Sequence, residues 1–463
     1  MTTSLGARMR RMVVAGTLTM AVMGNAAAQG PNEGALLRRI DSVVAEAMTR
    51  SKTPGMSVAV QHGATVILAK GYGMADLESS APASANTVYR LGSVTKQFTA
   101  LAIMQLVEAG KVRLDDEISA YLPDFPLQGH RVTVHHLLTH TSGIRNYTAL
   151  GPRFWQDASR RDLSDAQMVA LFKDEPFDFA PGARWNYSNS GYYLLGMIVE
   201  KASGLPYRQY LHERILTPLG LSATSYCDEA PVIPGRAQGY EVVKGQVVND
   251  GIISMNTPGA AGAMCSTVLD LLKWQRALVE HRLISRASTE RMRTVATLND
   301  GKATTYAYGL GVGQLEGHRR IGHGGGINGF ITQLDYFPAD DLTVVVLGNL
   351  GGAPSGEVAG KVARLSLGME LEVPKDLPVA AAAVAWYVGT WDLGAQGTVE
   401  VVRDGDRLVL KAGGQEVPLK HQGNGVFIAA GLGGPRLTFL PAGARAEMLQ
   451  VELGGTTLQG KRK

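Results

Sequence analysis

The spacing of hydrophobic residues at the start of the chain changes from a helical period to strand-like runs. Apolar residues recur every three or four positions through residues 33–51, which predicts an amphipathic helix. Two short apolar runs follow, 56–61 and 65–70, and His62-Gly63 between them is typical of a tight turn. The pattern therefore predicts one helix followed by a β-hairpin.

The next patterned segment, residues 93–109, is apolar on nearly every face. A helix without a polar face has to be buried, so we expect this helix in the centre of the molecule, ending at Gly110. Further helices are expected near 190–203, 206–216 and 267–281.

Strand-like patterns return late in the chain. We expect strands at 306–312, 330–337 and 342–348, the last two joined by a turn at Pro338–Asp341. Strands on both sides of a mainly helical segment indicate one sheet assembled from both ends of the chain. The pattern therefore predicts an α+β fold.

The composition shifts near residue 370. Residues 371–384 hold two prolines and a run of alanines, which is typical of a linker. From 385 to 463, short alternating segments separated by glycine and aspartate predict a small antiparallel β domain. We therefore divide the chain into a main domain of residues 29–370, this linker and a C-terminal β domain.

Residues 1–28 have the pattern of a secretory signal peptide. Three arginines precede an apolar run, 12–24, that is too short to span a membrane, and Ala26-Ala27-Ala28 offers a small-residue cleavage site. We expect cleavage after Ala28, a periplasmic or secreted protein and no stable membrane anchor. The alternative is an uncleaved anchor helix.

Charge and cysteine content narrow the possible partners. Without residues 1–28, which hold three arginines and no acidic residue, 42 basic and 41 acidic residues remain. This near-neutral balance argues against nucleic acid or an anionic membrane as the main partner.

Cys227 and Cys265 are the two cysteines. In an oxidising compartment such a pair favours a disulfide, the alternative being two buried thiols.

Two separated segments carry side chains suited to acyl transfer. Ser93 and Lys96 are three residues apart, so they share one face of the expected central helix. A serine nucleophile needs an adjacent base, and burial lowers the pKa of a lysine. Tyr187 could act as a phenolate base beside a cationic lysine and then as an acid toward the leaving group. Asn189 could hold Lys96 or bind a substrate amide.

A third segment, His323-Gly324-Gly325-Gly326, precedes an expected strand. A tetrahedral intermediate needs two backbone N–H donors, and Ser93 can supply one of them. A glycine at a strand edge can supply the other, because no side chain blocks the approach. We expect Gly326, with Gly325 beside it, to fill this role, and His323 to be largely neutral at its ordinary pKa.

His135, His136 and His140 form a histidine cluster, and the last two have the spacing of a helical metal-binding pair. The glutamate of an H-E-x-x-H motif does not lie between them. We therefore interpret the cluster as structural and expect neither a metal nor a cofactor.

The ordered motifs S-x-x-K, Y-x-N and H-x-G resemble those of the serine β-lactamase and DD-peptidase superfamily. The segments 137–143 (LLTHTSG) and 322–326 (GHGGG) are similar to its class C-like branch of β-lactamases, D-amino-acid-specific peptidases and serine esterases. The resemblance covers about residues 33–370. It implies a β-lactamase/transpeptidase-like domain, an antiparallel sheet flanked by helices, that works through an acyl-enzyme on Ser93. Residues 386–391 resemble the start of a small β domain often appended to such hydrolases.

The third motif departs from that of class C β-lactamases, which carry Lys-Thr-Gly where this chain has His323. The resemblance therefore implies a serine hydrolase acting on small esters or on peptide amides with D-residues, including cell-wall fragments. Two alternatives stay open, a class C-like β-lactamase and a catalytically silent binder of peptidoglycan or β-lactams.

Overall fold

The structure, a computed structural model, describes residues 31–371, 375–394, 397–405, 407–412, 415–429, 435–453 and 456–463. The predicted signal peptide and its cleavage site lie outside the described residues, as do residues 372–374 of the predicted linker. In the described part of the chain, the search for membrane-spanning helices finds none.

A seven-stranded antiparallel sheet forms the centre of the main domain, in the order β3-β2-β1-β12-β11-β10-β9. Its strands are β1 Gly55–His62, β2 Thr65–Asp76, β3 Ala81–Pro82, β9 Gly311–Leu315, β10 His318–Ile327, β11 Phe330–Phe337 and β12 Leu342–Gly348. The N-terminal β1 pairs with the late β12, with Val58 opposite Val346. This pairing confirms the sheet that was expected from both ends of the chain.

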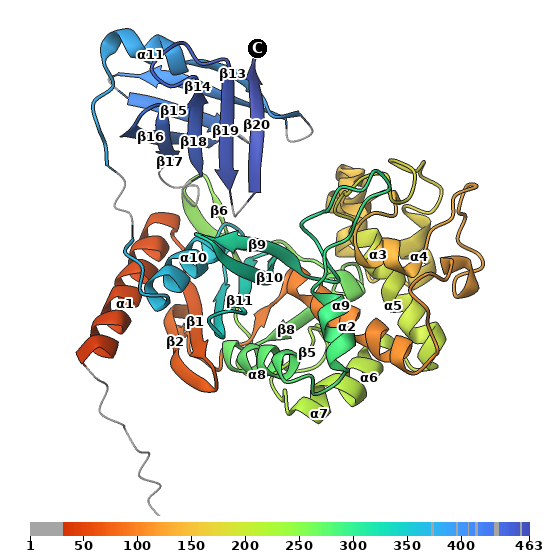
Figure 1. The fold of residues 1–463 in the computed structure, drawn as a ribbon. Helices are drawn as coiled ribbons and strands as arrows, with labels where there is room; N and C mark the ends of the chain where they lie inside the picture. The colour runs from red at the N-terminus through yellow and green to blue at the C-terminus, as the bar shows by residue number, and fades with distance from the viewer. Residues whose placement is uncertain are drawn as a thin grey trace, which may run out of the picture.

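The two central strands, β1 and β12, are buried on both faces, which explains why they show apolar runs rather than alternation. On one face, Val58 and Val346 pack in a core with α1 Pro31–Ser51 and α10 Ser355–Ser366. On the other face, Ala59 and Val345 join the larger core around α2 Thr95–Glu108. Figure 1 shows α1 and α10 lying together beside β1 and β2.

Seven α-helices lie between α2 and β9 in the described sequence of the main domain. They are α3 Val134–Leu138, α4 Asp165–Ala170, α5 Asn189–Ser203, α6 Tyr207–Leu211, α7 Thr217–Leu219, α8 Val268–Val279 and α9 Arg286–Met292. Phe98 of α2 stacks on Trp274 of α8, with ring centroids 3.9 Å apart. Figure 1 shows α3, α4 and α5 on the side of α2 that faces away from the seven-stranded sheet. The expected central helix is therefore confirmed.

Short strands tie these parts together. The strands β4 Tyr89–Arg90 and β5 Ser225–Tyr226 both pair with β8 Met264–Ser266, and β6 Tyr240–Val243 pairs with β7 Gln246–Asn249. Because β4 leads directly into α2, the first of these sheets anchors the start of the central helix.

The strand expected at 306–312 begins only at Gly311, so this prediction is wrong for residues 306–310. Ala307 N–H donates to the carbonyl of Leu310 in a tight turn. Gly309 has a φ of +67°, and a Cβ there would lie 2.6 Å from the carbonyl oxygen of Lys96. Glycine at position 309 therefore allows this turn to pass close to α2.

The C-terminal region forms a closed antiparallel barrel, which confirms the predicted β domain. Its strands are β13 Gly389–Asp392, β14 Thr398–Asp404, β15 Arg407–Ala412, β16 Gln415–Gly423, β17 Val426–Ala429, β18 Arg436–Leu440, β19 Met448–Leu453 and β20 Thr456–Arg462. α11 Ala381–Tyr387 begins in the last residues of the predicted linker and continues into the predicted β domain. The Tyr387 ring lies 4.9 Å from Phe427 and 5.1 Å from Phe439, so α11 packs on the barrel core.

Candidate active site

Ser93 and Lys96 stand where the chain turns into α2. Ser93 lies in a single 3-10 turn, Gly92–Val94, that runs directly into the helix. Lys96 Nζ lies 3.1 Å from Ser93 Oγ. Gly92 has a φ of +53°, and a Cβ there would lie 2.9 Å from the backbone nitrogen of Gly326. Only glycine at this position lets the turn approach β10 so closely.

Lys96 is fully buried, and beside Ser93 it makes two further hydrogen bonds, both to oxygen acceptors. Its Nζ donates to Asn189 Oδ1 at 2.8 Å and to the carbonyl oxygen of Ala261 at 2.7 Å. Burial holds the pKa of Lys96 well below its ordinary value. A neutral amine has two N–H groups for these two acceptors and one lone pair for the hydroxyl proton of Ser93. The arrangement can therefore activate the hydroxyl.

Tyr187 lies just before α5, with its ring centroid 4.8 Å from Lys96 Nζ. Its hydroxyl oxygen is buried, and the hydroxyl of Ser93 is the polar group beside it. Burial raises the pKa of this phenol well above its ordinary value, and the nearby Ser93 hydroxyl opposes that effect only in part. Tyr187 therefore stays protonated near neutral pH, where it can donate a proton or a hydrogen bond, in place of the phenolate base expected from the sequence.

Asn189 begins α5 and is held from two sides. Its backbone N–H donates to Asn146 Oδ1 at 3.1 Å, while its own Oδ1 accepts from Lys96. Ser188 caps the helix by accepting from the N–H of Gly191. The cap and the Asn146 contact fix the side chain of Asn189 toward Lys96.

The third segment lies on β10, beside the turn that carries Ser93. His323 Nε2 lies 2.8 Å from the hydroxyl of Tyr306, and burial lowers the pKa of His323 to about 4, which leaves the imidazole neutral near pH 7. A Cβ on Gly325 would lie 1.9 Å from the carbonyl oxygen of Leu91, so this glycine allows β10 to pack against the turn. Gly326 is exposed, and its N–H can serve as a donor beside Ser93.

A cavity of about 280 Å³ opens onto Ser93. Tyr187, Asn189 and Gly326 line the same cavity. Lys96, His323 and Gly325 do not line the cavity. The structure thus brings the three predicted segments together around one opening.

The comparison with known families fits this arrangement. Residues 40–368, about seven tenths of the chain, match the family model described as Beta-lactamase. The chain belongs to the beta-lactamase family. Penicillin-binding protein 4* from Bacillus subtilis is 29% identical over 383 residues, which cover 78% of this chain and 84% of that protein. A D-aminopeptidase from Brucella anthropi is 29% identical over 364 residues, with coverages of 78% and 68%.

Solved structures of this family share the fold. The octameric penicillin-binding protein homologue from Pyrococcus abyssi matches with a TM-score of 0.67 at 29% identity, over 92% of this chain and 100% of that one. A D-stereospecific amidohydrolase from Streptomyces matches with a TM-score of 0.61 at 28% identity, over 71% and 97%. Membership of the beta-lactamase family, a β-lactamase/transpeptidase-like fold and a serine-hydrolase class of enzyme follow from these matches.

The sequence indicated a structural role for His140 but not which part of this beta-lactamase-family site it supports. His140 lies beyond the end of α3 and has a φ of +60°, so it is not on a helix with His136. Its Nδ1 accepts the N–H of Ser188 at 3.2 Å, and its ring lies 4.2 Å from that of Tyr187. His140 therefore supports the Tyr187 segment, a contact that its spacing from His136 could not have shown.

Of the two arrangements expected for the cysteines, a disulfide or two buried thiols, this structure has the second. Cys227 and Cys265 are both buried free thiols. They lie in a small apolar core with Val88, Ile253 and Met255. A free cysteine packs in such a core as a small hydrophobic residue, so no bridge is needed to hold these strands.

Proposed function

We propose that this serine hydrolase cleaves small amides and esters, with D-residue peptides among the amides, through an acyl-enzyme on Ser93. The observation that carries the proposal is the environment of Lys96. Its buried amine lies 3.1 Å from Ser93 Oγ, and its two further hydrogen bonds are to uncharged oxygen acceptors. A lysine in this setting suits the role of base better than the role of ion-pair partner.

In the proposed acylation, Ser93 Oγ forms a bond to the substrate carbonyl carbon while its proton moves to Lys96 Nζ. The N–H groups of Ser93 and Gly326 stabilise the negative charge on the carbonyl oxygen. The bond to the leaving nitrogen or oxygen then breaks. Tyr187 gives its proton to that atom and regains one from Lys96. Water attacks the ester on Ser93 by the reverse proton movements and restores the enzyme.

The names of the relatives support an amide substrate, because one is a D-aminopeptidase and another a D-stereospecific amidohydrolase. A β-lactamase activity is less well supported, since a neutral His323 stands where class C β-lactamases carry a lysine. A silent binder is disfavoured because Ser93, Lys96 and Tyr187 are all present and close together. Export through the predicted signal peptide, cut after Ala28, is part of the same proposal.

Three chromogenic substrates test this proposal: p-nitrophenyl butyrate, N-acetyl-D-alanine p-nitroanilide and nitrocefin. We expect the protein of residues 29–463 to release nitrophenolate or nitroaniline, to leave nitrocefin intact, and to lose its activity in Ser93→Ala. Rapid nitrocefin hydrolysis that depends on Ser93 would instead identify a β-lactamase. Hydrolysis that persists in Ser93→Ala would remove the serine from the mechanism.

A further inference from the structure

The cavity that opens onto Ser93 is walled mainly by apolar and aromatic side chains. Six of them surround it: Tyr147, Phe154, Trp155, Ile253, Pro258 and Ile327. The polar side chains that join them are uncharged, and among the described residues that line the cavity none is acidic or basic. Such a wall favours an apolar group of the substrate over a charged one.

Whether a substrate brings a charged group into this cavity depends on whether its amino group is free or acylated. In a substrate with a free amino-terminal residue, the α-nitrogen and the scissile carbonyl carbon are bonded to the same α-carbon, about 2.5 Å apart. When that carbonyl contacts Ser93, the ammonium must enter the cavity as well. A cation that loses its water there needs a carboxylate partner to be tolerated.

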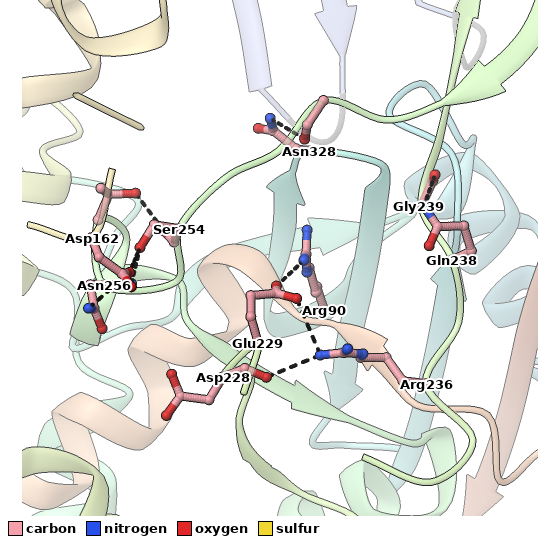
Figure 2. A network of polar contacts seen from close by, with 12 residues as sticks. Arg90, Asp162, Asp228, Glu229, Arg236, Gln238, Gly239, Ser254, Asn256 and Asn328 are labelled. Carbon is pink, nitrogen blue, oxygen red and sulfur yellow. Dashed lines mark hydrogen bonds and ion pairs between the residues drawn. The ribbon is translucent and has the colours of Figure 1, made fainter. Parts of the chain in front are cut away.

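The carboxylate next to the Ile253 side of the cavity already has partners. Asp162 Oδ1 accepts a hydrogen bond from Ser254 Oγ at 2.6 Å and another from Asn256 Nδ2 at 3.2 Å. Figure 2 shows these three residues joined to one another. Asp162 therefore holds residues 254–256, which follow Ile253 in the chain, in place. It does not line the cavity.

The acidic side chains on the β4 side belong to a different cavity. Glu229 is paired with both Arg90 and Arg236, as Figure 2 shows. Asp250 and Glu229 line a cavity that shares only Ile253 with the one at Ser93. These carboxylates therefore do not supply the partner that an ammonium would need beside Ser93.

We propose that the cavity takes the acyl group of the substrate in an uncharged, apolar form and discriminates against a free α-ammonium. The substrates of this class are esters of alkyl or aryl acids and N-acylated D-amino-acid amides. The inference rests on the proposed function, which it narrows. It separates the chain from an aminopeptidase, whose substrates carry a free amino terminus.

The test compares kcat/KM for N-acetyl-D-phenylalanine p-nitroanilide and D-phenylalanine p-nitroanilide at several pH values, with Ser93→Ala as control. At pH 6 we expect the acetylated substrate to be cleaved at least about tenfold faster, because it carries no charge into the cavity. The ratio should narrow as pH rises through the ordinary α-amino pKa of about 8, where the free substrate becomes neutral. If the free-amine substrate is cleaved equally well at pH 6 and this cleavage depends on Ser93, the inference is wrong but the proposed function stands. Cleavage independent of Ser93 overturns the proposed function with it.

A variant pair tests the wall itself. Trp155 is 46% exposed at the cavity, and Leu77, which does not line it, is 43% exposed. Trp155→Glu places a carboxylate at the cavity, so we expect the preference for the acetylated substrate at pH 6 to fall about tenfold or more. Leu77→Glu adds the same charge elsewhere and should leave the ratio unchanged. Equal ratios in the two variants would contradict the inference.

Discussion

At the scale of the residue, the account depends on a lysine that is buried among neutral groups. Lys96 contacts the hydroxyl of Ser93, the side-chain oxygen of Asn189 and the carbonyl of Ala261. None of these three groups carries a full charge to compensate an ammonium for its lost hydration. Burial therefore favours the neutral amine, which is the form that can accept a proton. The same burial lowers the free energy of unfolding at pH values where the lysine is charged in the unfolded chain.

This loss of stability predicts a pH-dependent effect of Lys96→Met. The folded-state pKa of Lys96 lies well below its unfolded value, so unfolding takes up a proton between the two values. Wild-type stability therefore falls as pH decreases below the unfolded pKa, and Lys96→Met lacks this loss. We expect the Tm of Lys96→Met, relative to wild type, to rise as pH is lowered from about 10 to about 7.

Thermal unfolding of both proteins across that pH range checks this prediction. Lys111→Met, which replaces an exposed lysine, is the matched control and should show no such trend. A Tm difference for Lys96→Met that stays constant with pH would contradict a lowered pKa.

Side-chain spacing predicted part of this site. The S-x-x-K spacing correctly placed Ser93 beside Lys96, and the order of the motifs pointed to Tyr187 and Asn189, which the structure brings to the same place. The carbonyl of Ala261 could not be predicted, because a backbone contact between residues so far apart leaves no signal in the side chains.

At the scale of the element, the close approach of β10 to the turn before α2 shapes the site. The strand β9 pairs with β10 only as far as Gly322, so the following glycines face the turn that carries Ser93. Thr332 of the neighbouring β11 donates to the carbonyl of Leu91 at 2.8 Å and fixes the two elements together. Gly325 lies between them, where a side chain would not fit.

Gly325→Ala tests this packing. Its Cβ would lie 1.9 Å from the carbonyl oxygen of Leu91 and 2.4 Å from Thr332 Oγ1, so β10 would have to move away from the turn. We expect kcat for p-nitrophenyl butyrate to fall about 10²-fold as Gly326 loses its place beside Ser93, and Tm to fall as well. In the control Gly360→Ala, where α10 leaves open space, we expect a gain of about 0.5–1 kcal/mol and unchanged kcat. Full activity in Gly325→Ala would contradict the assignment.

Alternation predicted some elements well and others not at all. The hairpin strands 330–337 and 342–348 were predicted with the bounds that the structure shows, because their apolar runs and turn residues are strong. The sequence placed Gly326 at a strand edge but did not predict β10 or its bounds, since its glycines provide no pattern of side chains. The turn at Gly309 is set by contact with α2, which local sequence does not report.

At the scale of the whole molecule, the two domains have separate cores. The barrel core around Trp391, Phe427 and Phe439 contains only residues beyond 378, whereas the cores of the main domain end at Leu371. The sequence predicted both domains from the change in composition. It did not predict that α11 belongs to the barrel, because the alanine run is equally compatible with a linker.

These separate cores predict that a chain of residues 29–375 folds on its own. We expect it to show a single cooperative thermal transition and to hydrolyse p-nitrophenyl butyrate within about threefold of the full-length rate, because the Ser93 cavity is lined by main-domain residues. Size-exclusion chromatography and ester hydrolysis measure these outcomes. An aggregated or inactive product would show that the barrel is needed to complete the main domain.

Covalent labelling shows which residue of this protein carries the acyl group, which we expect to be Ser93. The protein of residues 29–463 would be treated with a fluorophosphonate, digested and analysed by mass spectrometry, with Ser93→Ala as control. We predict one adduct, on the peptide that contains Ser93, and none in the variant. An adduct on another residue, or undiminished labelling of Ser93→Ala, would contradict the account.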